Sequence, residues 1–424
     1  MNVETKNTLF AEGKIDVPGL FPHLEASLEQ PVHFEMDFGL RELPTAPGLI
    51  LIRGARQLGK STWIESTLKS SLQELGPGSC YYLNGDYIKS EYELYNSIND
   101  IHYLYSGSAP LKRLFIDEVT AVKNWESALK KAYDEGVTRK TLIVTTGSQA
   151  IDLRRGAERL PGRKGKLDRT TYRFLPISYS EFSKHCRTHF GNETLEAYQL
   201  CGGSPIAANE LIQRKKIPPY IIELTRDWIL GECSRQGRSP SLLTFLLQDL
   251  HRKAQTPVSL TKLAKESGAA NNTVLQGYID LCKDLLSVAS CHNVDLQTLR
   301  PIPRKPAKLH FINLLTALVF DPDAPSSLEE FLSQDSQTKS KWLEWTVASH
   351  LWRQSALENE LDPEALMFWK SDQNEIDFIT DNRFIEVRLT PPSPIELAWF
   401  KKAHPKRNLE VIHRGNIENF LCCS

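Results

Sequence analysis

The sequence predicts an α/β fold whose first part is built on a parallel sheet. Short apolar runs suited to buried strands recur at 48–54, 80–83, 113–116 and 141–145. Segments with a helical spacing of apolar residues separate these runs, as at 124–133. Strands that alternate with helices of about 10 to 15 residues indicate βαβ units and a parallel sheet. The run 48–54 also ends in glycine, as expected of a buried parallel strand that then turns.

The second part of the chain is expected to be mainly helical and then mixed. Residues 180–253 have helical spacing, with interruptions that contain glycine or proline. The segments 258–268 and 273–282 predict two helices joined by a short turn, which is the helix-turn-helix plan. The proline-rich segment 300–306 is expected to be a linker or a wing. Beyond residue 309 the sequence predicts one helix and four short strands, at 341–357, 366–370, 375–380, 383–389 and 409–413.

Charge excludes one simple class of function. The 424 residues carry a formal net charge of −1, so the chain does not bind nucleic acid merely by being basic. The segment 154–173 is an exception, because it holds eight basic residues and two acidic ones. This cluster either meets the phosphates of a nucleotide or nucleic acid, or forms a solvated loop. Charge alone favours the solvated loop.

The sequence predicts neither a membrane span nor an exported, disulfide-linked protein. No apolar run approaches the ~20 residues that cross a bilayer. Residues 1–6 lack the pattern of a secretory signal. The eight cysteines form no CxxC pair, so neither a zinc ribbon nor a disulfide framework is indicated. We therefore expect a cytoplasmic protein with reduced thiols and no membrane partner.

A phosphate-binding loop is predicted directly after the first strand. Residues 54–61 read Gly-Ala-Arg-Gln-Leu-Gly-Lys-Ser and match the pattern G-x-x-x-x-G-K-[ST] in full. Such glycines let backbone N–H groups face the phosphates, and the following helix adds its positive N-terminal end. Lys60 is expected to reach the β- and γ-phosphates, and the hydroxyl of Ser61 to coordinate Mg²⁺. The residues expected to bind ATP here are Gly54, Ala55, Arg56, Gln57, Leu58, Gly59, Lys60, Ser61 and Thr62.

A pair of carboxylates closes a later predicted strand. The apolar run 114–116 is followed by Asp117 and Glu118. Asp117 is expected to hold Mg²⁺, directly or through water. Glu118 is expected to orient or deprotonate the attacking water, which requires hydrogen-bond reach. Its presence favours ATP hydrolysis over nucleotide sensing alone, so Glu118 and Lys60 are candidate catalytic residues.

Two more candidates follow the strand at 141–145. Either Thr146 or Ser148 could sense the γ-phosphate, although ordinary strand-end residues would give the same pattern; Ser148 is included among the expected ATP ligands. Arg163 could stabilise transition-state charge as an arginine finger. The neighbouring arginines do not allow this one to be singled out.

These motifs resemble those of AAA-type P-loop ATPases that carry a C-terminal domain of unknown function and occur in bacteria and archaea. The resemblance rests on the motifs at 54–61, 114–119, 146–148 and 162–163, and on Trp125 before a helix. Looser features of the second half agree with it, namely Tyr198, the two helices after 258, and the segments 202–205, 220–227, 374–377 and 385–387.

The resemblance implies a chain of four parts. They are an AAA-type P-loop core at 1–178, a helical lid at 179–255, a winged helix-turn-helix at 256–305 and a small α/β tail at 306–424. ATP is expected between the core and the lid. The tail is expected to be related to the PD-(D/E)xK fold of restriction endonucleases. Two positions depart from the family, because Thr120 stands where glutamine is usual and Arg388 where lysine is usual.

The tail presents a second candidate metal site. Asp377 and the run Glu386-Val387-Arg388, behind a helix that carries Glu344, resemble the D…ExK constellation of those nucleases. Two such carboxylates could share Mg²⁺, which lowers the pKa of a bound water. Arg388 is not interchangeable with the usual lysine. The alternative is a degenerate tail in which Glu386 and Arg388 form a cross-strand ion pair, and this alternative is favoured.

Three functions therefore remain open from the sequence. The first is an ATP-hydrolysing switch or motor that acts on DNA, with Asn271, Asn272, Thr273 and Gln276 at the start of a recognition helix. The second is a nucleotide-controlled regulatory or scaffold protein that binds protein partners or itself. The third is a Mg²⁺-dependent DNA nuclease that uses Asp377 and Glu386.

Overall fold

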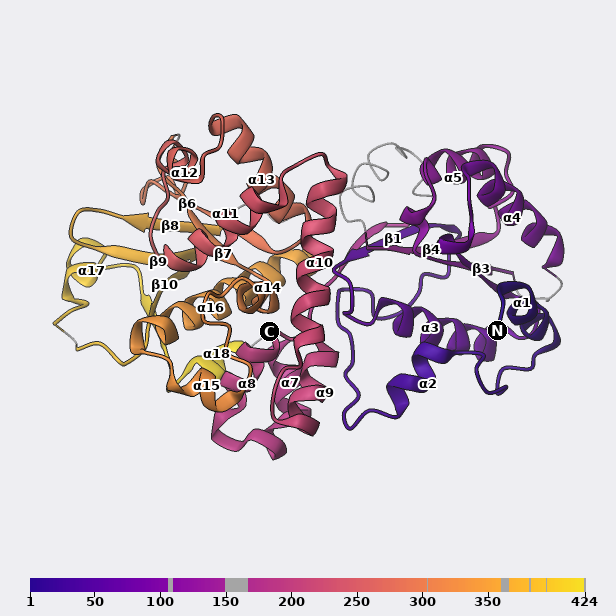
Figure 1. Ribbon diagram of the computed structural model, residues 1–424, viewed down its shortest axis with the longest axis horizontal. Coiled ribbons are helices and arrows are strands. Elements are labelled where there is room, and N and C mark those ends of the chain that lie inside the picture. The colour runs from indigo at the N-terminus through magenta and orange to yellow at the C-terminus, as the bar shows by residue number, and fades with distance from the viewer. Residues whose placement is uncertain are drawn as a thin grey trace. The chain divides into compact units, whose positions relative to one another are not determined.

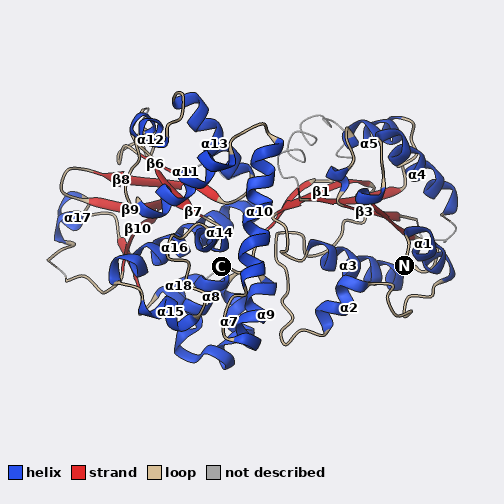
Figure 2. Ribbon diagram, viewed as in Figure 1, coloured by secondary structure: helices blue, strands red, loops and turns tan. Residues whose placement is uncertain are grey.

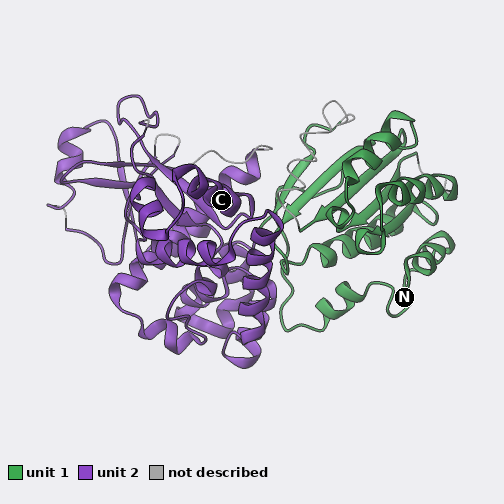
Figure 3. Cartoon of the chain, turned by 45° about the horizontal axis from the view of Figure 1, so that its top comes forward, with its two compact units in different colours: residues 1–175 green, residues 176–424 purple. Residues whose placement is uncertain are grey.

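The chain forms two compact units, Met1–Leu175 and Pro176–Ser424, which we call unit 1 and unit 2 (Figure 3). The structure is a computed structural model. The residues that it describes are 1–105, 110–148, 167–302, 304–359, 366–380, 383–393 and 395–422. No helix in these ranges has the length and apolar character that a membrane span requires.

Unit 1 is built on a five-stranded sheet in the order β2-β3-β4-β1-β5. Figure 1 labels β1, β3 and β4 of this sheet. All neighbouring strands are parallel, which confirms the predicted sheet. The predicted strands are present, and three of them extend by one or two residues beyond the predicted ranges. The strands are β1 (Gly48–Gly54), β2 (Cys80–Asn84), β3 (Lys112–Asp117), β4 (Thr141–Gly147) and β5 (Thr171–Phe174).

Helices cover both faces of this sheet (Figure 2). The helices are α1 (Val3–Glu12), α2 (Pro22–Leu28), α3 (Lys60–Leu75), α4 (Glu91–Leu104) and α5 (Trp125–Asp134), with short 3₁₀ turns at Gly85–Tyr87 and Val119–Ala121. Alternate residues of a strand point to opposite faces. Leu49 and Leu51 of β1 thus share one apolar cluster with Leu94 of α4 and Trp125 of α5.

The sequence analysis did not predict β5 or α4. β5 is a short edge strand with alternating residue types, and it lies in a segment whose dominant signal is its basic charge. It forms because β1 offers a free edge, along which Leu51 pairs with Thr171 and Gly54 with Phe174. α4 has a readable signal, since Leu94, Ile98 and Ile101 recur at helical spacing and are all buried.

Unit 2 contains a mixed six-stranded sheet in the order β11-β10-β9-β8-β6-β7. The pairs β10–β11 and β6–β8 are parallel, and the other neighbours are antiparallel. Its strands are β6 (Val288–Asn293), β7 (Lys308–Phe311), β8 (Leu366–Lys370), β9 (Glu375–Thr380), β10 (Arg383–Arg388) and β11 (Leu409–His413). The four strands predicted after residue 309 are confirmed as β8 to β11, whereas β6 and β7 were not predicted.

The remaining described elements of unit 2 are mostly helices. They are α7 (Tyr179–Phe190), α8 (Thr194–Cys201), α9 (Pro205–Arg214), α10 (Pro219–Arg235), α11 (Pro240–Arg252), α12 (Leu260–Ser267), α13 (Asn272–Asp284), α14 (Leu314–Val319), α15 (Leu328–Ser333), α16 (Ser336–Glu358), α17 (Ala398–Ala403), α18 (Ile417–Cys422) and a 3₁₀ turn at Gly191–Glu193. The long helix α16 packs against β7, β8 and β10. It starts five residues before the predicted 341, because the side chain of Asp335 caps it by accepting from the N–H of Thr338.

The two predicted helices of the helix-turn-helix are present as α12 and α13, with Gly268 in the left-handed conformation between them. A winged helix and the four-part division at 178, 255 and 305 remain predictions. The second sheet runs across residue 305, because β6 lies before it and β7 after it.

A glycine comparison tests the packing of unit 2. Gly202 ends α8 with a φ of 61°, and a Cβ there would lie 2.2 Å from the backbone nitrogen of Leu315. Gly237 has a similar φ of 66° with nothing within 4 Å. We expect Gly237→Ala to lower the free energy of unfolding by about 1–2 kcal/mol through backbone strain alone. Gly202→Ala should cost about 1–3 kcal/mol more, because it overpacks the contact with α14.

Urea unfolding of the two variants measures this difference. Equal losses would mean that α8 and α14 do not pack as closely as described.

Candidate active site

The predicted phosphate loop connects the end of β1 to the start of α3. Gly54 ends β1, where a Cβ would lie 2.5 Å from the carbonyl oxygen of Phe174, so only glycine fits. Gln57 and Gly59 have positive φ values of 62° and 96°, which turn the chain before Lys60 begins the helix. The loop therefore has the strand–turn–helix context that a phosphate-binding motif requires.

Lys60 is held within its own loop. Its side chain is buried, and its Nζ donates to the carbonyl oxygens of Gly54 at 3.0 Å and Ala55 at 2.8 Å. Burial lowers the pKa of Lys60, while the charges of Glu118 and Asp117 act in the opposite direction. The ammonium thus has neutral hydrogen-bond partners near two carboxylates that it does not contact directly, and it is available to an anionic ligand.

Asp117 and Glu118 each have a separate hydroxyl partner. Thr146 donates its hydroxyl to Asp117 Oδ1, and the N–H of Glu118 donates to the same Oδ1 at 3.1 Å. Ser148 donates both its N–H, at 3.0 Å, and its hydroxyl, at 2.9 Å, to Glu118 Oε2. The two residues proposed as alternative sensors therefore hold different carboxylates.

Residues after β2 also support the carboxylate pair, and the sequence analysis missed them. A Cβ at Gly85 would lie 2.3 Å from the carbonyl oxygen of Glu118, so this glycine lets the two turns approach. Glu118 itself has a φ of 49°. Burial raises the pKa of Asp86, and the charges of Glu118 and Asp117 raise it further. The available signal was a Gly-Asp pair directly after a predicted parallel strand.

Of the other predicted residues, some lie in the described part of unit 1 and others lie outside the described residues. Ser61 and Thr62 are half-buried in the first turn of α3, and Arg56 is exposed in the loop. The Asp117 carboxylate and the Ser61 hydroxyl are oxygen donors, which suit a hard cation such as Mg²⁺. Arg163 and most of the basic segment around it lie outside the described residues.

The family comparison agrees with this geometry. A family model described as "AAA domain" matches residues 46–183. The chain contains an AAA-type P-loop domain. That domain spans β1, the phosphate loop, the carboxylate pair and the hydroxyl residues Thr146 and Ser148 at the end of β4.

Solved structures with some likeness to the chain share little sequence with it. The Walker-type ATPase PABY2304 of Pyrococcus abyssi is 14% identical with a TM-score of 0.44, over 71% of this chain and 94% of that one. The ORC1 protein of Aeropyrum pernix in complex with DNA is 12% identical with a TM-score of 0.27, over 74% and 95%. AMPPCP-bound DnaA from Aquifex aeolicus is 15% identical with a TM-score of 0.28, over 58% and 84%. A comparison with curated proteins gave no match.

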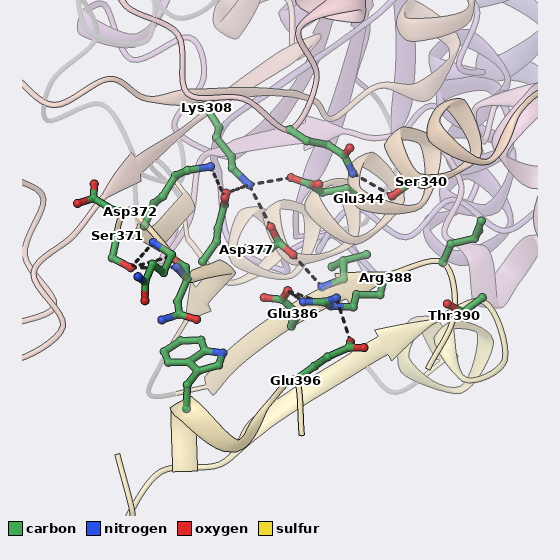
Figure 4. A pocket seen from close by; sticks show the side chains of 18 residues that line it. Lys308, Ser340, Glu344, Ser371, Asp372, Asp377, Glu386, Arg388, Thr390 and Glu396 are labelled. Carbon is green, nitrogen blue, oxygen red and sulfur yellow. Dashed lines mark hydrogen bonds and ion pairs between the residues drawn. The ribbon is translucent and has the colours of Figure 1, made fainter. Parts of the chain in front are cut away.

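Outside the AAA domain, unit 2 contains a charged pocket of about 680 Å³ between α16 and the strands β7 to β10 (Figure 4). Asp377 on β9 and Glu386 on β10, the predicted metal ligands of the tail, both line it. Arg388 pairs with Glu386, its Nη2 lying 3.0 Å from Oε1. The expected ion pair exists, but it joins residues two apart on one strand and not residues on two strands.

The sequence analysis missed Lys308, whose ammonium contacts three carboxylates in this pocket. Its Nζ lies 2.6 Å from Glu375, 3.0 Å from Asp377 and 3.2 Å from Glu344. Burial opposes the charge on Lys308, but these three carboxylates together raise its pKa well above the ordinary value. Burial raises the pKa values of Asp377 and Glu386, to which the negative charges of Glu344 and Asp377 respectively add.

A buried histidine next to this pocket predicts acid sensitivity. Burial, and then the charge of Lys308, lowers the pKa of His310 from 6.5 to about 3. Below pH 6.5, His310 therefore becomes protonated in the unfolded chain, whereas in the folded chain it stays neutral until about pH 3. His310 contributes stability above pH 6.5, and this contribution is lost at about 1.4 kcal/mol per pH unit as the pH falls.

We expect His310→Leu to weaken the pH dependence of unfolding by about 2 kcal/mol between pH 7 and pH 5. Tryptophan fluorescence in urea follows this transition, since Trp342 and Trp345 are buried in the same unit. His189→Leu, at an exposed position, serves as the control. An unchanged pH dependence in His310→Leu would show that this histidine is not held neutral.

Proposed function

We propose that the chain is an ATP-hydrolysing switch or motor that acts on DNA. The AAA domain binds ATP with Mg²⁺, and the hydrolysis cycle governs how unit 2 engages its partner. The observation that carries the hydrolytic part is the arrangement of Glu118, one of whose carboxylate oxygens accepts two hydrogen bonds from Ser148. This leaves Oε1 as the oxygen that can accept a proton from water.

The hydrogen bonds of Lys60 support nucleotide binding, because its ammonium can exchange carbonyl oxygens for phosphate oxygens. Lys60 now donates to two backbone carbonyls. Phosphate oxygens carry a full negative charge whereas carbonyl oxygens carry only a partial one, so the ammonium of Lys60 is attracted more strongly to a phosphate. Ser61 and Asp117 would hold Mg²⁺, which neutralises developing charge on the phosphates. Thr146 fixes the orientation of Asp117 through its hydroxyl.

The proposal of DNA as the partner rests on the exposed face of α12 and α13. Asn272 and Thr273 at the start of α13 are exposed, as are Lys262 and Lys265 on α12. Asn271 uses its side chain to cap α13 by accepting from Val274. The other candidate for base contact, Gln276, donates to Asp280. The contact is therefore expected to come mainly from the two lysines and the first turn of α13.

The alternative of a protein-directed regulator predicts ATP hydrolysis that is indifferent to DNA. The alternative of a Mg²⁺-dependent nuclease in unit 2 is not supported by the charged pocket. Lys308 already contacts Asp377, one of its two predicted metal ligands.

Steady-state ATP hydrolysis by the full chain tests the site. Lys60→Ala should lose both ATP binding and turnover. Glu118→Gln should keep ATP binding but lose about 10²-fold or more in turnover, because the general base is removed. Glu135→Gln, a carboxylate paired with Tyr95 at the surface, should behave as wild type. Undiminished turnover in Glu118→Gln would contradict the assigned role of this carboxylate.

Duplex and single-stranded DNA test the partner. We expect DNA to stimulate hydrolysis and its binding to weaken as salt rises, because phosphate contacts release counterions. The double change of Lys262 and Lys265 to alanine should reduce both effects and flatten the salt dependence. The same change at Lys401 and Lys402, an exposed pair on α17, is the matched control. Hydrolysis that DNA leaves unchanged would favour a protein partner instead.

A further inference from the structure

The acidic residues of the pocket in unit 2 resemble a metal site. The contacts within the pocket indicate that they do not form one. A divalent cation such as Mg²⁺ demands several oxygen ligands at fixed geometry and gives up its water reluctantly. Asp377 and Glu386 would have to supply carboxylate oxygens that are free to bind. The question is therefore which of their oxygens already have partners.

Three of the four carboxylate oxygens are engaged. Asp377 Oδ1 accepts from Lys308 at 3.0 Å, and Oδ2 accepts from the N–H of Val387 at 2.9 Å. Glu386 Oε1 accepts from Arg388 twice, from Nε at 3.2 Å and from Nη2 at 3.0 Å. Of these four oxygens, Glu386 Oε2 is the one that is buried without a hydrogen-bond partner. One free oxygen does not make a metal site.

A cation already lies where the carboxylates converge. The ammonium of Lys308 is in contact with Glu344 from α16 and with Glu375 and Asp377 from β9 (Figure 4). The lysine side chain is 1% exposed, and its Nζ lies 5.4 Å from the centre of the Phe368 ring. It cannot swing into water without breaking its contacts with three carboxylates, of which Glu344 and Asp377 are buried, and breaking a buried ion pair leaves an uncompensated charge.

The cluster of charges in the pocket has a small negative excess. Lys370 adds a second contact to Glu375 from the rim of the pocket, where its side chain is 42% exposed. Two lysines therefore face three carboxylates, which leaves one negative charge. Removal of the Lys308 charge would leave two, which is the charge that a divalent cation compensates. With Lys308 in place, no group of three or more His, Cys, Asp or Glu side chains in the described part of the chain is arranged to hold a metal ion, so a cation would require these side chains to close around it.

We propose that Lys308 is a built-in cation that takes the place of a divalent metal in this pocket. The wild-type chain binds no divalent cation there. Loss of Lys308 turns Glu344, Glu375 and Asp377 into a divalent-cation site. This inference concerns unit 2 alone and does not depend on ATP hydrolysis or DNA binding.

Manganese binding by the nucleotide-free full chain tests the proposal, with paramagnetic resonance reporting the free ion. All proteins carry Asp117→Asn, so that the AAA domain lacks the carboxylate assigned to Mg²⁺, and the variants are compared with one another on this background. The protein with native Lys308 should bind no Mn²⁺ in unit 2. The additional change Lys308→Ala should gain one Mn²⁺ per chain, and adding Asp377→Asn should abolish it. Lys370→Ala is the matched control and should gain none, because its ammonium lies at the exposed rim.

Thermal unfolding supplies a second measurement in case Lys308→Ala folds poorly. Lys308→Ala should melt at a lower temperature, and Mn²⁺ should restore part of the loss, while a chelator removes the effect. Neither Mn²⁺ nor chelator should move the transition when Lys308 is present. Two results would overturn the proposal. One is Mn²⁺ bound by the native-lysine protein and lost with Asp377→Asn, and the other is Lys308→Ala that Mn²⁺ neither binds nor stabilises.

Discussion

The parallel pairing of β4 with both β1 and β3 is the constraint on which the candidate active site depends. Arg53 lies opposite Gly147, and Ile116 lies opposite Thr145. One residue further along, the phosphate loop, the carboxylate pair and the two hydroxyl residues leave the sheet at the same edge. A shift of one residue in the β3–β4 pairing would turn Thr146 to the other face relative to Asp117 and separate the two side chains. The chemistry of the loop is thus fixed by backbone register before any side chain is considered.

Two buried lysines show how surroundings decide what a cation can do. Lys60 donates to neutral carbonyl oxygens, and burial lowers its pKa. A phosphate, which carries a negative charge, is therefore a stronger partner for Lys60 than the two carbonyl oxygens. Lys308 contacts three carboxylates that raise its pKa. Its charge is already compensated, so we propose that the same residue type binds a ligand in unit 1 and acts as an internal counter-ion in unit 2.

Sequence patterns predicted the features that depend on local order. The loop at 54–61 and the pair Asp117–Glu118 could be predicted because each consists of consecutive residues at the end of a predicted strand. The strands at 366–370 and 409–413 were predicted with their bounds intact, because each is a short run with clear breaks. The AAA domain could therefore be recognised without knowledge of any contact.

The features that were missed depend on residues far apart in the chain. β7 is only four residues long and follows a proline-rich segment, so no strand was predicted at Lys308. Its burial follows from α16 and β9, which bring Glu344 and Asp377 to it from 36 and 69 residues away. The two hydroxyl–carboxylate pairs, Thr146 with Asp117 and Ser148 with Glu118, likewise depend on the register of β3 and β4.

The most direct test of the central claim is the Mg²⁺ dependence of ATP affinity, measured by calorimetric titration of the nucleotide-free chain. If Asp117 and Ser61 hold the metal beside the phosphate loop, Mg²⁺ should tighten ATP binding by the wild type. The same titration with Asp117→Asn should show ATP binding that no longer responds to Mg²⁺. An Asp117→Asn protein that keeps the full Mg²⁺ effect would contradict the assignment of this carboxylate and of the site built around it.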